Sequence, residues 1–282
     1  MRTVFIELKN HYPLKGGSLK GLIIDNPWDN CDDGRLSWKR PALIVVPGGG
    51  YYFISNREGD AVASQFFAKG FQVFVLEYLC KPDGAFYPEQ LFELSCAIDY
   101  VKKHADDFFV NPDEIFTLGF SAGGHLVCDE SNEYATVSDR LGVLIDCKPT
   151  AVALGYPVID NHDGSFDNLL FGYDKTIAEK MKNDLRLNCR VGKQTPPSFV
   201  WTTAQDNVVD PANSLNYCLA LSKFSVPFEL HVYPKGEHGK ATGLPEINYE
   251  RDNKASYSEW KCLSRWVDDA IRFFKSFCVE RL

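Results

Sequence analysis

The sequence lacks any run of lysine or arginine, and its formal net charge over 282 residues is −8. An electrostatic footprint for nucleic acid or for an anionic membrane surface is therefore missing, and we expect neither as a partner. No stretch approaches the roughly 18 apolar residues that a membrane span requires. The first residues, MRTVFIELKN, lack the apolar core of a secretory signal, so we expect a cytoplasmic location.

Paired cysteines are missing as well. The nine cysteines are scattered and odd in number, with no CxxC pair and no zinc-type Cys/His spacing. We interpret them as reduced thiols that pack as small hydrophobes. The acidic stretch Asp160–Asn168 includes His162 but lacks the spacing of a calcium loop, so a polar loop is predicted there. Neither a metal nor a cofactor is expected.

Short apolar runs alternate with segments of helical period along most of the chain. The runs cover 42–46, 71–78, 115–120, 151–157, 198–204 and 228–234, and the helical segments cover 58–70, 88–104, 211–224, 258–277 and the residues after 121. This alternation predicts an α/β fold, a mostly parallel central sheet with helices on both faces. Residues 3–8 and 20–25 alternate more strongly and suit an antiparallel edge.

The chain shows no internal repeat and no low-complexity linker, so we predict a single domain over residues 1–282. Residues 160–197 contain no strand of their own. Long insertions in compact domains are often lids or binding loops. We therefore expect a small lid there, with a short helix around Ile177–Leu185, and we assign substrate selection to it.

Glycines crowd one hydroxyl in the stretch TLGFSAGGHL, where Gly119 and Gly123 flank Ser121 at two residues on either side. An apolar strand precedes the serine and helix-compatible residues follow it, which is typical of a nucleophile at a strained strand-to-helix turn. Side chains at the two glycine positions would collide with neighbouring backbone. The N–H of Ala122, at the start of the helix, would face a developing oxyanion. The alternative is a glycine-rich turn with a bystander serine.

A nucleophilic serine needs a base, and the base needs a third group to orient it. Among six histidines, only His238 follows a late strand on a glycine-flanked loop, and a solvated loop histidine is its alternative role. Asp206 and Asp210 both follow the strand at 198–204. Asp210 precedes Pro211 and suits a helix N-cap, so Asp206 is the preferred acid.

The Gly-rich loop in VVPGGGYY directly follows an early strand, where a second oxyanion donor is expected. A flexible loop without function is the alternative. The aromatic residues Tyr51, Tyr52, Phe53 and Trp201 could line a substrate site, although aromatic side chains are more often simply packed.

Together the stretches PGGGYY, GFSAGGH, YPVID, TPPSFVWTTAQDNVVDPANSL and ELHVYPKGEHG resemble the α/β-hydrolase fold, and more narrowly the carboxylesterases related to acetyl xylan esterases and feruloyl-esterase-like enzymes. The resemblance implies Ser121 as nucleophile, Asp206 as acid and His238 as base. It further implies an oxyanion hole formed by Gly49, Gly50 and Ala122.

The same resemblance implies hydrolysis of short-chain esters, acetyl esters of sugars or xylo-oligosaccharides above all, through an acyl-enzyme. Two features depart from relatives: Pro47 replaces the His of an HGGG motif, and EYLCKPDG lacks a Tyr-Arg pair. A serine peptidase or amidase of the oligopeptidase type stays an alternative, as does a non-catalytic binding module on the same fold. The sequence leaves a homo-oligomer open.

Overall fold

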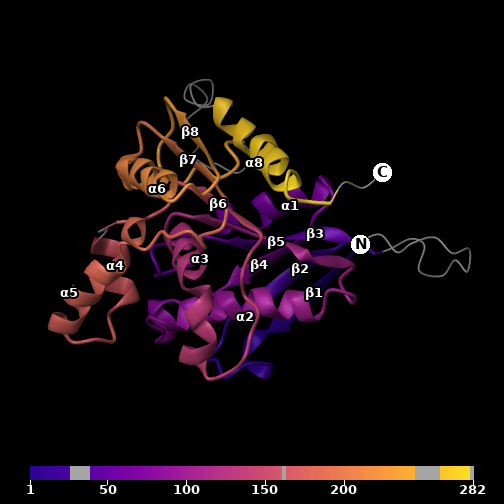
Figure 1. The fold of residues 1–282 in the computed structure, drawn as a ribbon, viewed down its shortest axis with the longest axis horizontal. Coiled ribbons are helices and arrows are strands. Elements are labelled where there is room, and N and C mark those ends of the chain that lie inside the picture. Colours follow the sequence, from indigo (N-terminus) through magenta and orange to yellow (C-terminus); the bar gives the residue numbers. More distant parts are fainter. Residues whose placement is uncertain (26–38, 161–162, 245–260, 280–282) are drawn as a thin grey trace, which may run out of the picture.

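The structure, a computed structural model, describes residues 1–25, 39–160, 163–244 and 261–279. Within them, eight strands form one sheet in the order β1-β2-β4-β3-β5-β6-β7-β8 (Figure 1). The strands are β1 (Arg2–Glu7), β2 (Ser18–Ile23), β3 (Arg40–Val46), β4 (Gln72–Glu77), β5 (Val110–Phe120), β6 (Ala151–Gly155), β7 (Ser198–Thr203) and β8 (Phe228–Tyr233).

The sheet is parallel from β4 through β8. At the other edge, β1 pairs with β2 and β2 with β4, both antiparallel. The predicted α/β class and antiparallel edge are therefore confirmed. The strand β5 begins five residues earlier than its apolar run, because Val110 pairs with Arg40 across a register irregularity.

Helices cover both faces of the sheet (Figure 1). They are α1 (Asp60–Ala68), α2 (Glu89–Lys103), α3 (Ala122–Leu141), α4 (Asp163–Leu169), α5 (Lys175–Asp184), α6 (Ala212–Lys223) and α8 (Arg265–Lys275). Along β3, Leu43 and Val45 pack in the core cluster that holds α1 and α8. The alternate residues, Ile44 and Val46, pack in the cluster that holds α2, α3 and α6. The two-residue period of a strand thus supplies both cores.

The segment expected to form a lid contains two helices. The helix predicted around Ile177–Leu185 is present as α5. The polar loop predicted over Asp160–Asn168 is wrong, because α4 begins at Asp163. Phe166 is fully buried on α4, so packing against the domain outweighs the polar composition. Asn161, His162 and residues 258–260 of the predicted last helix lie outside the described residues.

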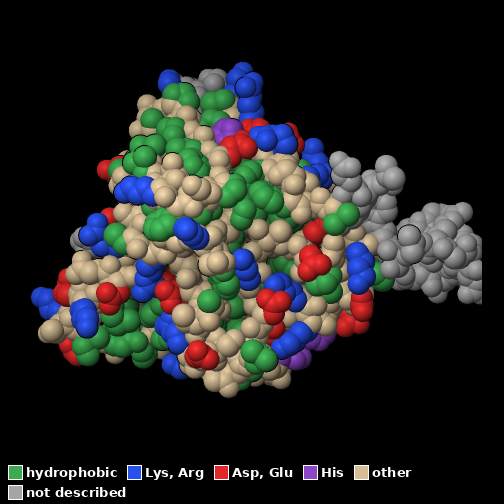
Figure 2. All heavy atoms as spheres, viewed as in Figure 1, with side chains coloured by type: hydrophobic (Ala, Val, Ile, Leu, Met, Phe, Trp, Pro, Cys, Tyr) green, Lys and Arg blue, Asp and Glu red, His purple; other side chains and the backbone are tan. Residues whose placement is uncertain are grey.

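Over the described ranges, no helix is both long and apolar enough to cross a bilayer. The same residues contain no group of three or more His, Cys, Asp or Glu side chains that could hold a metal ion. Figure 2 shows acidic and basic side chains interspersed over the face in view.

Candidate active site

Three loops at the carboxyl edge of the parallel strands carry the side chains singled out from the sequence. Ser121 directly follows β5, Asp206 comes three residues after β7, and His238 comes five residues after β8. Because parallel strands end at the same edge of a sheet, these loops converge although they are distant in sequence.

The structure brings the three side chains into one hydrogen-bonded series. His238 Nδ1 lies 2.7 Å from Asp206 Oδ2, and His238 Nε2 lies 2.9 Å from Ser121 Oγ. The Asp206 side chain is 1 % exposed and that of His238 15 % exposed. Since an ionised carboxylate only accepts, Nδ1 carries the hydrogen and Nε2 is the nitrogen that can take the serine proton.

The two candidate acids have different partners. The second oxygen of Asp206, Oδ1, accepts hydrogen bonds from the N–H groups of Val208 and Val209, which fixes the carboxylate. Asp210 Oδ1 instead accepts from the N–H of Ala212 at 2.8 Å, at the start of α6. Pro211, the residue directly before α6, already has a helical backbone (φ −51°, ψ −24°). Asp210 therefore precedes the first helical residue and caps this end as expected, which leaves Asp206 beside the imidazole.

Ser121 stands at a strained turn. Its backbone has φ 52° and ψ −119°, a conformation that residues other than glycine rarely adopt. A Cβ at Gly123 would lie 2.2 Å from Val46 O, and one at Gly119 would lie 2.3 Å from Gly123 O. The predicted reason for both glycines, a collision with neighbouring backbone, is therefore present, and the turn exists because both side chains are missing.

The Gly-rich loop after β3 lies against this turn. A Cβ at Gly48 would come 2.9 Å from the Cβ of Ser121, and one at Gly49 would come 1.9 Å from Phe53 O. Gly49 has φ 126° and Gly50 has φ 61°. Ala122 is the first residue of α3, where N–H groups lack partners within the helix. The three predicted oxyanion donors thus come from segments that adjoin the serine.

A buried glutamate, which the sequence reasoning missed, holds this loop. Glu58 Oε2 accepts from the N–H of Gly48 at 2.7 Å, and Oε1 accepts from the Tyr156 hydroxyl at 2.7 Å. The Tyr156 hydroxyl in turn accepts from the N–H of Ala241 at 3.1 Å, and its ring lies 4.7 Å from the His238 ring. Burial and Glu58 raise the pKa of Tyr156, which stays a neutral donor. The network therefore joins the glycine loop to the histidine loop.

A second histidine, His125 on α3, is enclosed beside the site. Its Nε2 lies 3.3 Å from the carbonyl of Leu185, which only accepts, and its Nδ1 lies 2.8 Å from the Tyr51 hydroxyl. In a neutral ring Nδ1 is then the acceptor and Tyr51 the donor. Burial lowers the pKa of His125 to about 3, so the ring is neutral. Phe166 of α4 packs on the same ring at 5.1 Å.

The aromatic residues expected near the substrate differ in how far they are exposed. Trp201 is fully buried and stacks on Trp266 with ring centroids 5.2 Å apart, and Tyr51 is 1 % exposed. For Tyr51 and Trp201, the expected substrate contact is therefore corrected to core packing, the alternative expected from the sequence. Tyr52 and Phe53 are 55 % and 59 % exposed, and a substrate contact by Tyr52 stays a prediction.

Fold and site together define a class. The strand order, the sharp turn at Ser121 and the loops that follow β7 and β8 are those of an α/β hydrolase. The family model BD-FAE matches residues 35–221, so the chain belongs to the BD-FAE family. The resemblance to carboxylesterases and acetyl xylan esterases is thereby confirmed.

Curated relatives and solved structures agree with this assignment. Endo-1,4-beta-xylanase B of Butyrivibrio fibrisolvens is 33% identical over 74% of this chain and 34% of its own length. Acetylxylan esterase of Xylanibacter ruminicola is 30% identical over 82% of this chain and 47% of its own length. The chain thus spans between a third and a half of these relatives.

Two crystal structures are similar over nearly whole chains. A carboxylesterase from Lactobacillus plantarum has a TM-score of 0.81 and 26% identity, with 100% of both chains covered. An acetyl ester-xyloside bifunctional hydrolase from Caldicellulosiruptor lactoaceticus has a TM-score of 0.74 and 30% identity, covering 95% of this chain and 97% of its own.

Proposed function

We propose that this protein hydrolyses carboxylic esters through an acyl-enzyme on Ser121. The observation that carries the proposal is the series of hydrogen bonds from Ser121 Oγ through His238 to Asp206, at 2.9 and 2.7 Å. In this arrangement the imidazole nitrogen Nε2 can accept the serine proton, while the buried carboxylate of Asp206 accepts a hydrogen bond from the second nitrogen, Nδ1.

In the first half-reaction, Ser121 Oγ attacks the ester carbonyl carbon as its proton passes to His238 Nε2. The carbonyl oxygen becomes negative and accepts hydrogen bonds from the N–H groups of Gly49, Gly50 and Ala122. The tetrahedral centre then collapses, the bond to the alcohol breaks, and His238 gives its proton to the leaving oxygen. A water molecule repeats the sequence on the acyl-enzyme and releases the acid.

For the substrate we propose short acyl groups, acetyl above all, on sugars or xylo-oligosaccharides. The proposal is supported by the names of two similar proteins, an acetylxylan esterase and an acetyl ester-xyloside bifunctional hydrolase. A small ester is the expected partner, and a homo-oligomer stays open. For the location we keep the cytoplasmic proposal, since the eight described cysteines are free thiols; Cys31 lies outside the described residues.

The test compares nitrophenyl esters of increasing acyl length with an aryl amide of the same acid. We expect the highest kcat/KM for the acetyl ester and a value for the amide lower by orders of magnitude. A preference for long acyl chains would contradict the short-acyl proposal. Amide turnover comparable with that of the ester would favour the peptidase or amidase alternative.

A further inference from the structure

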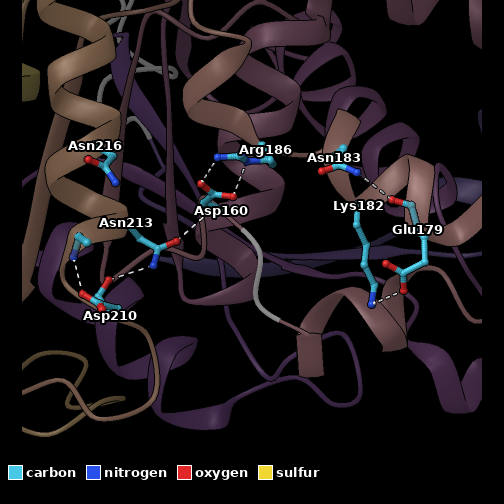
Figure 3. A pocket seen from close by; sticks show the side chains of 9 residues that line it. Asp160, Glu179, Lys182, Asn183, Arg186, Asp210, Asn213 and Asn216 are labelled. Atoms are coloured by element: carbon cyan, nitrogen blue, oxygen red, sulfur yellow. Dashed lines mark hydrogen bonds and ion pairs between the residues drawn. The ribbon is translucent and has the colours of Figure 1, made fainter.

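A polar cleft of about 460 Å³ lies between α5 and the start of α6 (Figure 3). Glu179, Lys182 and Asn183 come from α5, and Asn213 and Asn216 come from α6. Figure 3 shows the α6 side chains on one side of the cleft, those of α5 on the other, and a bonded Asp160–Arg186 pair between them.

The cleft adjoins the segment that leads away from the nucleophile. Asn213 Oδ1 accepts hydrogen bonds from the N–H groups of Ile159 and Asp160, at 2.9 and 2.8 Å. In the same segment, the N–H of Val158 donates to the carbonyl of Ser121 at 3.0 Å. One short stretch of chain therefore connects the wall of the cleft with the turn that carries Ser121.

Most of the charged side chains that line the cleft have an opposite charge beside them. Arg186 donates two hydrogen bonds to Asp160, at 2.7 and 2.9 Å. Lys182 lies 3.2 Å from Glu179 and 2.8 Å from Asp167, which does not line the cleft. Asp210 also lines the cleft, and its carboxylate accepts from the N–H of Ala212. Opposite charges held this close largely cancel at a distance, and Asp210 adds one negative charge, so the field of the cleft is weak and disfavours anionic ligands. Its rigid polar wall still offers fixed donors and acceptors.

The amide side chains supply both kinds of hydrogen-bonding group. Asn183 and Asn216 are exposed at the cleft, and each amide carries an oxygen that accepts and a nitrogen with two hydrogens that donate. One hydrogen of the Asn183 amide is directed to the carbonyl of Glu179 at 3.2 Å, which leaves the other for a ligand. A neutral, hydroxyl-rich ligand suits such a lining, because each hydroxyl both donates and accepts. We propose that this cleft binds a sugar unit of the alcohol part of the substrate. The inference rests on the proposed esterase function.

The direct test measures binding of unacetylated xylotetraose by calorimetry in a Ser121→Ala background, where no turnover interferes. We expect the double variant Asn183→Ala/Asn216→Ala to raise the Kd about tenfold, since each neutral hydrogen bond contributes modestly. The matched control, Lys180→Ala/Ser222→Ala, changes exposed residues of the same two helices outside the cleft and should leave the Kd unchanged.

A kinetic test uses the enzyme with Ser121 intact. The ratio of kcat/KM for an acetylated xylo-oligosaccharide to that for p-nitrophenyl acetate should fall about tenfold in the Asn183→Ala/Asn216→Ala variant. Ester turnover by Ser121→Ala would refute the esterase mechanism alone. Absence of xylotetraose binding, or equal binding by parent and double variant, would overturn the sugar cleft whatever the esterase result.

Discussion

Two histidines near Ser121 have opposite surroundings. His238 lies on a loop, partly exposed, with a carboxylate on one nitrogen and a hydroxyl on the other. His125 lies on α3, fully enclosed, with the Tyr51 hydroxyl on one nitrogen and a carbonyl on the other. If the ring of His125 gained a proton, its positive charge would be buried without a negative partner. The carboxylate of Asp206 supplies that negative partner to His238. The partner on the far nitrogen therefore decides which imidazole can act as a base.

The substitution Asp206→Asn removes the negative charge that distinguishes the surroundings of His238 from those of His125. The amide can donate to His238 and so favours the wrong tautomer, and we expect kcat on p-nitrophenyl acetate to fall about 10⁴-fold. The matched control is Asp129→Asn, which alters another buried carboxylate, one that pairs with Arg190 at 3.0 Å. We expect the control to keep kcat within about threefold; an equal loss in both variants would remove the special role of Asp206.

A smaller loss is expected for Glu58→Gln. The carboxylate accepts from both Gly48 N–H and the Tyr156 hydroxyl, whereas an amide turns a donor toward one of them. We expect kcat to fall about tenfold to a hundredfold with little change in KM, because the glycine loop shifts relative to Ser121. Glu114→Gln, at a buried glutamate seven residues before Ser121, serves as control. Wild-type kcat in Glu58→Gln would show that this network does not position the loop.

The variant His125→Phe tests the other half of the comparison. It leaves the Tyr51 hydroxyl and the Leu185 carbonyl without their partner, and we expect a loss of about 1–3 kcal/mol in the free energy of unfolding. Because His125 is neutral at every pH of assay, the pH profile of kcat/KM should keep its wild-type shape. Urea unfolding and pH–rate profiles provide the two readings, and a changed profile would mean that His125 titrates during turnover.

The smallest effect on activity is expected from a substitution away from the site, which changes the pH dependence of stability instead. Burial raises the pKa of Glu93, on α2, from 4.5 to about 8. The folded state therefore binds more protons than the unfolded state between about pH 4.5 and 8, and this contribution to stability is lost as the pH rises through that window. We expect Glu93→Gln to flatten the decline by several kcal/mol, since one pH unit of pKa difference corresponds to about 1.36 kcal/mol.

The check for Glu93 is the free energy of unfolding by urea at pH 5 and pH 8. The variant Glu237→Gln, at an exposed side chain, should retain the wild-type decline. Equal declines in wild type and Glu93→Gln would contradict the buried, protonated carboxyl.

Local pattern predicted much of the fold, because apolar runs and helical periods are written in neighbouring residues. The strands β3, β4, β6, β7 and β8 and the helices α1, α2 and α6 lie close to their predicted bounds. The helix α4 could not be predicted this way, since its polar sequence becomes helical only where Phe166 packs on His125.

The residues of the site likewise include some that the sequence predicts and some that it does not. Ser121, Asp206 and His238 follow strands in the order that the fold imposes, so chain order was enough to choose them. Glu58 and Tyr156 meet across 98 residues and lack any motif, although a glutamate soon after a Gly-rich loop could have drawn notice. The burial of Trp201 likewise depends on Trp266, 65 positions later in the chain.

Every step of the proposed reaction requires Ser121 to be an activated nucleophile. Labelling with a fluorophosphonate probe, followed by peptide mass spectrometry of wild type and Ser121→Ala, tests this directly. We expect one adduct, on Ser121, that is absent from the variant. An unlabelled wild type, or an adduct that persists on another residue in Ser121→Ala, would contradict it.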